Sequence, residues 1–395
     1  MKKETDISGQ VKFYFYLIPF TSIALAGMVA AFYRMVRDKA FGGFKPKAAD
    51  ILIMLMTLSF LISSLLSKYR GESLGSFAIF LFYPLSFYAA RFLLAKGRGA
   101  ESKVFYALTV ACFIVSAAGL LQYFTGADII VQKKFININI TKVNNEITST
   151  LGHPNHLAAY LLTVLPFILY RFLNGNKRGD RLFSIVTILA GILCLILTFA
   201  RGGWIGIVFS FFLYAYIIDK KFFLILLLIL IGFPLISTNT LISKIESFTS
   251  PDSYGQRVFA WQASVDMIKD KPIFGHGLHT FYRLYPEYKG PNASELLSHA
   301  HNIFLDIWVE CGTAGILFFI LIIVNIIYRV LKTERRVLKQ SPMIFYLCSC
   351  GAILLQAFID TILDNAQLGS MWWFFLGGIY YYTQLKDYEG REASL

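Results

Sequence analysis

The sequence predicts an all-α polytopic membrane protein with about eleven transmembrane helices, within a range of ten to twelve. The chain has 395 residues, of which 56% are hydrophobic and 15% charged. Its apolar runs approach the ~20 residues that a helix needs to cross a bilayer. The longest polar stretch between them, residues 238–301, is too long to be a simple connection. We therefore expect one integral membrane domain, residues 1–395, with one large, partly helical loop.

The apolar runs place the spans near residues 11–33, 50–67, 73–95, 103–124, 155–173, 182–200, 202–218, 221–237, 302–330, 342–360 and 366–384. The run 302–330 is long for one crossing and contains Gly312 and Gly315. We therefore expect its first turns to form a separate or tilted segment. Within the 238–301 loop, the residue pattern predicts a helix from Gln256 to Lys269.

Basic residues predict the orientation of the chain. They collect in five short segments, at residues 34–47, 96–103, 171–181, 220–221 and 329–339, which alternate consistently on one side of the predicted spans. Short cytoplasmic loops carry such an excess of Lys and Arg. These segments also account for most of the net charge of +13, so the charge does not indicate a nucleic-acid partner. The extracytoplasmic face then holds residues 125–154, Arg201, the 238–301 loop and the link with Asp360 and Asp364.

All six histidines fall on that face, in three pairs: His153 with His156, His276 with His279, and His299 with His301. Grouped histidines first raise the possibility of zinc. Their spacings of three, three and two residues, without a Cys partner or a His-Glu-x-x-His signature, lead us to predict no metal and no cofactor. A metal-dependent membrane hydrolase remains an alternative. The sequence has no nucleotide-binding glycine loop or Gly-x-Ser-x-Gly elbow, which argues against ATP-driven transport and serine hydrolysis.

His301 begins the most informative pattern in the chain. It runs His301-Asn302, nine residues, Gly312, two residues and Gly315. An imidazole accepts and returns protons near neutral pH, which suits general acid or base catalysis. The paired glycines let another backbone come close. The ordinary alternative is a histidine anchored at the lipid interface.

Two arginines add to this pattern. Arg201 lies between two apolar segments joined by almost no loop, and an ionisable group at membrane depth is a candidate functional residue. Its alternative role is an interfacial anchor beside Trp204. Arg257 opens the amphipathic stretch of the long loop and would, by itself, be an ordinary surface arginine.

Four stretches together resemble the O-antigen ligase and O-antigen polymerase superfamily: Gly152-His153-Pro154-Asn155, Arg201-Gly202-Gly203-Trp204, Gly275-His276-Gly277-Leu278-His279-Thr280-Phe281, and His299-Ala300-His301-Asn302 through Gly315. They occur in order within about residues 150–320, which we take as the catalytic core. The resemblance implies transfer of a glycan from an undecaprenyl-pyrophosphate donor at the outer face of the bacterial cytoplasmic membrane. The acceptor would be the hydroxyl of a lipid, a glycan repeat or a protein.

The resemblance also implies roles for three residues. Arg201 and Arg257 would clamp the pyrophosphate and stabilise the charge that develops as it leaves. His301 would take the proton of the acceptor hydroxyl as that oxygen attacks the anomeric carbon. Such a displacement inverts the anomeric centre and requires no metal.

Seven further residues are expected to contact substrate or support the site: Asn302, Asp306, Glu310, His276, His279, His153 and Asn155. The first three recur at helical spacing of four. Asp306 and Glu310 face lipid only at high cost, so we place them inside the bundle, where they orient His301, pair with Arg201, line the acceptor path or form a structural polar pair. His276 and His279 are expected to contact the loop or the substrate. His153 and Asn155 fit a cap and turn as well as a glycan contact.

Polymerase and ligase differ only in the acceptor. The Lys-rich, Ala-poor composition favours a polymerase for exopolysaccharide, capsule or a related wall polymer, and protein O-glycosylation remains open. A transporter or flippase of a lipid-linked oligosaccharide is the alternative from another class. It would carry inverted repeats, and we detect no repeated half in the sequence.

Overall fold

A computed structural model describes residues 8–19, 24–37, 46–126, 129–133, 136–140, 146–218, 251–291, 293 and 296–385. Its elements are α1 (Ser8–Leu17), α2 (Leu25–Arg37), α3 (Ala48–Leu66), α4 (Arg70–Phe80), α5 (Phe82–Leu94), α6 (Arg98–Thr125), β1 (Ile129–Lys133), β2 (Ile136–Ile140), the 3-10 turn η2 (Ser149–Leu151), α7 (Pro154–Asn174), α8 (Arg178–Leu197), α9 (Arg201–Ile218), α12 (Pro251–Asp270), α13 (Phe281–Tyr288), α14 (Ile303–Lys332), α15 (Arg335–Gln340), α16 (Met343–Ala357) and α17 (Ala366–Tyr382).

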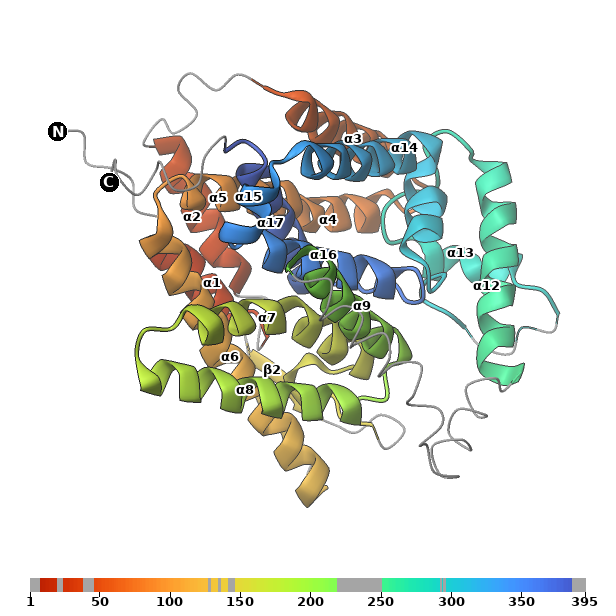
Figure 1. Cartoon of the computed structure of the whole chain (residues 1–395). Coiled ribbons are helices and arrows are strands. Elements are labelled where there is room, and N and C mark those ends of the chain that lie inside the picture. Colours follow the sequence, from red (N-terminus) through yellow and green to blue (C-terminus); the bar gives the residue numbers. More distant parts are fainter. Residues whose placement is uncertain are drawn as a thin grey trace.

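Most of the described residues form a bundle of apolar helices (Figure 1). Seven helices among them are long and apolar enough to cross a membrane: Ala48–Leu66, Arg70–Leu94, Gly99–Thr125, Pro154–Asn174, Arg178–Leu197, Arg201–Ile218 and Ile303–Lys332. A shorter apolar helix, α16, has 15 residues. A multi-pass, mainly helical membrane protein is therefore confirmed. The predicted span at 221–237 lies outside the described residues.

One predicted span is divided. The run 11–33 was expected to form one helix but forms two, α1 and α2, and Gly27 of α2 lies against Tyr14 of α1. The chain turns next to Pro19, which has no N–H to continue a helix. The predicted span 73–95 is confirmed as Arg70–Leu94, with a local turn at Leu81 between α4 and α5 because Pro84 cannot donate to the carbonyl four residues earlier.

The expected all-α class is confirmed for the bundle, and one short hairpin lies outside its helices. β1 and β2 pair in antiparallel fashion, with Ile129 opposite Ile140, inside the predicted 125–154 loop. The strand 136–140 alternates isoleucine and asparagine, which is the period of a strand with β-branched residues on one face. The predicted helix at 256–269 is confirmed within α12, which extends from Pro251 to Asp270.

The long helix α14 is kinked at Gly312, where φ is 65° and ψ is −172°. The two N–H groups after the kink donate to the carbonyl oxygens of Pro272 and Ile273, at 2.8 and 3.1 Å. Two helix carbonyls before the kink accept the N–H groups of His276 and Gly277, at 3.0 and 2.8 Å. The loop after α12 therefore replaces the hydrogen bonds that the helix loses at the kink.

Glycine is required on both sides of this contact. A Cβ on Gly312 would lie 2.3 Å from the carbonyl oxygen of Ile273, and one on Gly275, where φ is +69°, would lie 2.5 Å from that of Glu310. Gly315 packs against Phe60 of α3. The expected close backbone approach and the separate first segment of the 302–330 span are both confirmed.

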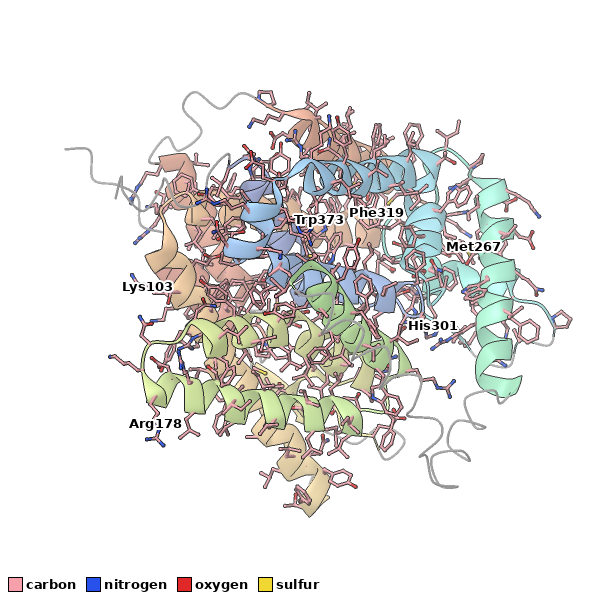
Figure 2. The ribbon with its side chains drawn as sticks, viewed as in Figure 1. Lys103, Arg178, Met267, His301, Phe319 and Trp373 are labelled. Carbon is pink, nitrogen blue, oxygen red and sulfur yellow. The ribbon has the colours of Figure 1, made fainter. Side chains whose placement is uncertain are left out.

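The bundle has a basic end and a histidine end. Figure 2 shows Lys103 and Arg178 at one end and His301 and Met267 at the other. α14 packs along α3, α17 along α5, and α16 along α9 and α7. In Figure 1, α12 and α13 lie beside the first turns of α14, at the histidine end. The loop helices and the histidine end of the bundle therefore form one continuous region.

We expect Gly312→Ala to destabilise the protein. Alanine in this left-handed conformation is strained, and its Cβ overlaps the Ile273 carbonyl. The cost is roughly 2 kcal/mol or more, and the melting temperature in detergent should fall by several degrees. Gly75→Ala is the matched control, because a Cβ there meets nothing within 4 Å. An unchanged melting temperature for Gly312→Ala would show that the loop does not depend on this contact.

Candidate active site

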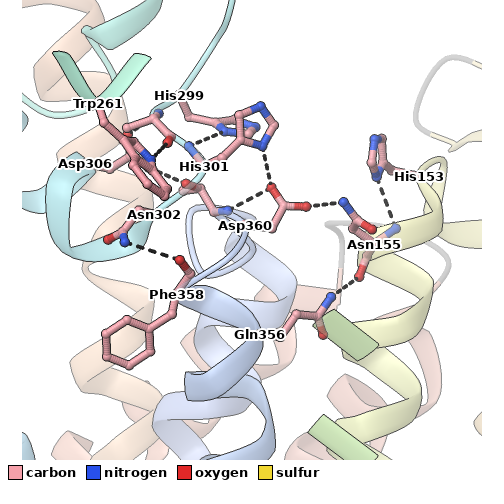
Figure 3. Close-up of polar contacts among 12 residues, drawn as sticks. His153, Asn155, Trp261, His299, His301, Asn302, Asp306, Gln356, Phe358 and Asp360 are labelled. Atoms are coloured by element: carbon pink, nitrogen blue, oxygen red, sulfur yellow. Dashed lines mark hydrogen bonds and ion pairs between the residues drawn. The ribbon is translucent and has the colours of Figure 1, made fainter. Parts of the chain in front are cut away.

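His301 and Asp360 form the centre of the candidate site. The Nδ1 atom of His301 lies 2.9 Å from Oδ1 of Asp360 (Figure 3). His301 has a φ of 53°, which is uncommon for a residue other than glycine. Two contacts hold this turn: the N–H of His301 donates to Nδ1 of His299 at 3.3 Å, and the N–H of Ala300 donates to Asp306 at 2.7 Å. The position of the His301 ring is therefore fixed by the backbone of this turn as well as by the contact of the ring with Asp360.

Asn302 joins two helices at this point. Its side-chain oxygen accepts the N–H groups of Phe304 and Leu305, at 3.0 and 3.2 Å, and so caps α14. Its amide group donates to the carbonyl oxygen of Phe358 at 3.2 Å. Asn302 therefore ties the start of α14 to the chain that leaves α16.

Asp360 is buried and receives hydrogen bonds from several directions. Its second oxygen accepts the side-chain amide of Asn155, and Oδ1 also accepts the N–H of Thr361 at 2.9 Å. Burial alone would raise the pKa of Asp360, but the hydrogen bond and charge of His301, with the charges of His299 and Arg257, hold that pKa well below its usual range. The carboxylate is therefore ionised and able to orient the imidazole.

Two of the histidine pairs meet around Asp360. The rings of His299 and His301 lie 4.2 Å apart, and those of His153 and His156 lie 5.3 Å apart. His153 caps α7 by accepting the N–H of Asn155 at 3.2 Å, so the expected cap is present. Burial lowers the pKa of His153. Burial and the charge of His301 lower the pKa of His299 to about 4.

The third histidine pair, His276 with His279, lies outside the group of residues around Asp360. His276 is buried, with Nε2 2.9 Å from the carbonyl oxygen of Met267, and burial lowers the pKa of His276. His276 thus contacts the loop, which was one of its two expected roles. His279, in contrast, has a φ of 54° and lines a cavity.

That cavity has a volume of about 330 Å³. Its polar wall includes Ser76, His279, Ser298, His299, Asp306, Glu310, Thr361 and Asp364, and its apolar wall includes Phe60, Phe80, Phe319 and Trp373. Asp306 bonds to Ala300 and to the hydroxyl of Thr361, and the carboxylate of Glu310 is bonded to the N–H groups of His279 and Phe281. Asp306 and Glu310 therefore lie inside the bundle, as expected, rather than against lipid.

Asp364 adds a third carboxyl group to the cavity wall. Burial and the negative charges of Asp306 and Asp360 raise the pKa of Asp364 to about 7. The wall therefore holds three carboxyl groups, of which Asp364 is about half protonated at neutral pH, and no arginine or lysine is among its lining residues.

The two predicted arginines lie on helices that reach the same region. Arg201 is the first residue of α9. A Cβ on the next residue, Gly202, would lie 2.9 Å from Gln356, which donates to the carbonyl oxygen of Asn155 at 3.0 Å. On α12, Arg257 lies close enough for its charge to act on Asp360.

Trp261 fixes α12 in this position. One turn after Arg257, its Nε1 donates to the carbonyl oxygen of Ala300 at 2.9 Å, directly beside His301 (Figure 3). The long loop is thereby attached to the turn that carries the candidate base.

The residues around Asp360 also form a possible metal site. His299, His301 and Asp360 place one ligand atom each within 4.8 Å of one another. Two imidazoles and a carboxylate suit zinc. In the structure each of these side chains already has a hydrogen bond, because the His301 ring bonds Asp360 and the His299 ring accepts the backbone N–H of His301.

Sequence reasoning gave no role to Asp360, Asp364, Gln356, Thr361 or Trp261. The two aspartates were placed on the correct link between apolar helices but were not connected to His301. The available signal was an ionisable side chain at a membrane boundary, which is a functional candidate by default.

We expect His299→Asn to flatten the pH dependence of stability. Above about pH 6.5, His299 is neutral in both states. As the pH falls, the unfolded residue binds a proton that the folded one does not bind until about pH 4, so the wild type loses up to about 3 kcal/mol across this window. Asn keeps an acceptor for the His301 N–H. Melting temperatures from pH 7 to 4 measure the difference, and parallel curves for the two proteins would contradict it.

The chain is similar to one protein family and to two known proteins. Residues 185–320 match the family model described as O-Antigen ligase. An uncharacterized protein of Haemophilus influenzae is 24% identical over 338 residues, covering 79% of this chain and 80% of the relative. The exopolysaccharide production protein ExoQ of Rhizobium meliloti is 29% identical over 135 residues, covering 31% of this chain and 30% of ExoQ. The chain therefore carries an O-antigen ligase family domain and is a multi-pass membrane enzyme of the glycosyltransferase type.

Proposed function

We propose that the protein transfers a glycan from an undecaprenyl-pyrophosphate donor to an acceptor hydroxyl by a metal-independent, inverting displacement. The observation that carries this proposal is the His301–Asp360 pair. Arg257 lies close enough for its charge to act on Asp360. The start of α9, where Arg201 lies, packs against Gln356, on the segment that leads to Asp360. The arginines of the site fit an anionic donor, and its location in a membrane protein fits a donor that is linked to a lipid.

His301 is the general base. Its Nδ1–H donates to the ionised Asp360, so that Nε2 presents a lone pair to the acceptor hydroxyl. As the hydroxyl oxygen forms its bond to the anomeric carbon, Nε2 takes the proton, and Asp360 stabilises the imidazolium. The bond from the anomeric carbon to the pyrophosphate oxygen breaks, and its electron pair leaves with the undecaprenyl pyrophosphate.

Arg201 and Arg257 receive this leaving group. Pyrophosphate gains negative charge as the bond breaks, and guanidinium groups match its oxygens with paired hydrogen bonds. Charge that is fixed before the reaction stabilises the transition state without reorganisation. The arginines thereby perform the task that a divalent cation performs in other phosphate-releasing enzymes.

The acceptor enters through the cavity beside His299. Its carboxyl groups, Asp306, Glu310 and Asp364, form hydrogen bonds with sugar hydroxyls, and its lining offers no lysine or arginine to a pyrophosphate. His279 lies in the same wall, and Asn155 and His153 support Asp360 from the other side. Donor and acceptor thus approach His301 from regions of different chemistry.

The reaction takes place on the extracytoplasmic face of the cytoplasmic membrane. The histidine end of the bundle lies opposite Lys103 and Arg178, and short cytoplasmic loops are rich in such residues (Figure 2). We keep the number of spans at about eleven. This number counts the seven long helices together with α16, α17, the 221–237 run and one crossing from residues 11–33. The whole chain is one integral domain, with the 238–301 loop inserted in a catalytic core at about 150–320.

We infer that the acceptor is the end of a growing glycan. The Rhizobium relative is named for exopolysaccharide production, and the composition of this chain favours the same class of product. A polymerase of lipid-linked repeats is therefore the preferred assignment, with lipid and protein hydroxyls as the other acceptors.

The purified protein should lengthen a glycan from an undecaprenyl-pyrophosphate donor in detergent with EDTA present. His301→Ala should lose about 10²–10⁴-fold in rate, and Arg201→Ala and Arg257→Ala about 10²-fold or more each. Arg178→Ala, an exposed arginine at the opposite end of the bundle, is the matched control and should keep full activity. Movement of intact donor across vesicles without transfer would favour the flippase instead.

Activity that disappears with EDTA and returns with zinc would replace the metal-independent mechanism by metal-assisted chemistry at His299, His301 and Asp360. The variant His299→Ala distinguishes the metal-independent mechanism from the metal-assisted one. It removes one ligand atom of the possible metal site but leaves the His301–Asp360 hydrogen bond.

Asp360→Asn should lower kcat by about 10–100-fold with a much smaller change in the KM values. The amide keeps the size of the side chain but no longer selects the Nδ1–H tautomer or stabilises the imidazolium. Steady-state kinetics with donor and acceptor varied in turn measure this. An effect confined to the donor KM would assign Asp360 to binding instead.

A further inference from the structure

Three side chains of the candidate active site lie close enough together to share one metal ion (Figure 3). Among the residues that the structure describes, His299, His301 and Asp360 are the one group in which three ligand atoms all lie within 4.8 Å of one another. Zinc binds imidazole nitrogens at about 2.0–2.1 Å and carboxylate oxygens at about 2.0–2.2 Å. Ligand atoms around a tetrahedral zinc ion are therefore roughly 3.4 Å apart, so shifts of about 1 Å bring all three onto one ion.

The turn before α14 brings the two imidazoles together. The rings of His299 and His301 lie 4.2 Å apart, and the left-handed backbone of His301, with a φ of 53°, gives the turn its shape. Nδ1 of His299 accepts the N–H of His301, which leaves Nε2 of His299 as the nitrogen for a metal. Asp360 meets this turn from the segment after α16, with Oδ1 2.9 Å from Nδ1 of His301. Zinc would therefore join two separate segments of the chain.

A cation can reach these ligands from the cavity with the carboxyl groups. His299 lines that cavity together with Asp306, Glu310 and Asp364, and no lysine or arginine is among the lining residues. The side chain of His301 is 23% exposed. The approach to the imidazoles therefore offers oxygen atoms that attract a divalent cation and no side-chain cation that repels it.

We propose that zinc binds to His299, His301 and Asp360 as an inhibitor of the transfer reaction, and not as its cofactor. The inference rests on the proposed function, in which the neutral His301 ring takes a proton at Nε2. A zinc ion on Nε2 occupies the lone pair that would accept this proton. A zinc ion on Nδ1 replaces the hydrogen bond to Asp360, and the one proton of the neutral ring then lies on Nε2. In both cases His301 no longer serves as a base.

The ligand set favours zinc over the common hard cations. Two of the three side chains are imidazoles, whereas magnesium and calcium take oxygen ligands. Three protein ligands, with the positive charge of Arg257 acting on Asp360, predict weaker and more readily reversed binding than at a closed site with four protein ligands. Magnesium is therefore the matched control ion.

Zinc binding to the purified full-length protein, freed of metal with EDTA and then of EDTA, tests the site without substrate. Competition with a chromophoric chelator gives the dissociation constant. His299→Asn keeps an acceptor for the His301 N–H but removes one imidazole, so the constant should rise at least about tenfold. His276→Gln, in the histidine pair outside this group, is the matched control and should keep the wild-type constant.

X-ray absorption at the zinc edge gives an independent measurement on the wild type. The spectrum should show two imidazoles, with oxygen as the remaining ligand type, at about 2.0–2.2 Å from the ion. A shell of oxygen atoms alone would place the ion among the carboxyl groups of the cavity and would contradict the assignment.

The effect on transfer is measured in the same preparation, with magnesium present throughout and free zinc increased in steps. Transfer by the wild type should fall over the zinc concentrations at which binding occurs, whereas magnesium alone should not lower it. In His299→Asn, the zinc concentration that halves the variant's own zinc-free rate should rise at least about tenfold.

The outcomes separate the two proposals. No transfer by the wild type, with or without zinc, would overturn the proposed function. Transfer that zinc does not inhibit, or an unchanged zinc dissociation constant in His299→Asn, would overturn only the inhibitory site. Transfer that requires zinc would overturn both the inhibition and the metal-independent mechanism.

Discussion

The hydrogen bonds of one buried carboxylate organise the histidine end of this protein. Asp360 accepts the side-chain amide of Asn155 at the start of α7 and the ring of His301 before α14, while its own segment leaves α16. A buried charge is tolerated only when its oxygens are satisfied. Each of these elements therefore has to reach Asp360 in the folded state, which brings together residues from widely separated parts of the chain and places His301 at their junction.

The kink at Gly312 makes the long loop part of the membrane domain. The backbone hydrogen bonds that α14 loses at the kink are replaced by bonds to the segment after α12, and Trp261 joins α12 to the turn before His301. Helix and loop are therefore stabilised by the same contacts. The position of Arg257 relative to Asp360 follows from this attachment, because Arg257 lies one turn before Trp261 on the same helix.

Charge is sorted around the candidate base. The carboxyl groups of Asp306, Glu310 and Asp364 share one cavity, whereas Arg201 begins α9 and Arg257 lies on α12, outside the lining of that cavity. The proposed donor, which is anionic, and the proposed acceptor, which is rich in hydroxyl groups, would be distinguished by such an arrangement before any specific contact is made. Asp360 is ionised between them and, in the proposed mechanism, orients the neutral His301 ring to take one proton.

The sequence by itself determined the helical membrane class, most span positions, the helix at 256–269, the break near Gly312 and the inward direction of Asp306 and Glu310. These follow from local apolar runs, from glycine's backbone freedom and from the high cost of a carboxylate in lipid. Only the tertiary structure decided that Asp360 is the partner of His301, that His299 rather than His276 joins them, and that residues 11–33 fold back as two helices. Those features depend on which distant helix ends meet, and a pattern local in sequence carries no information about that packing.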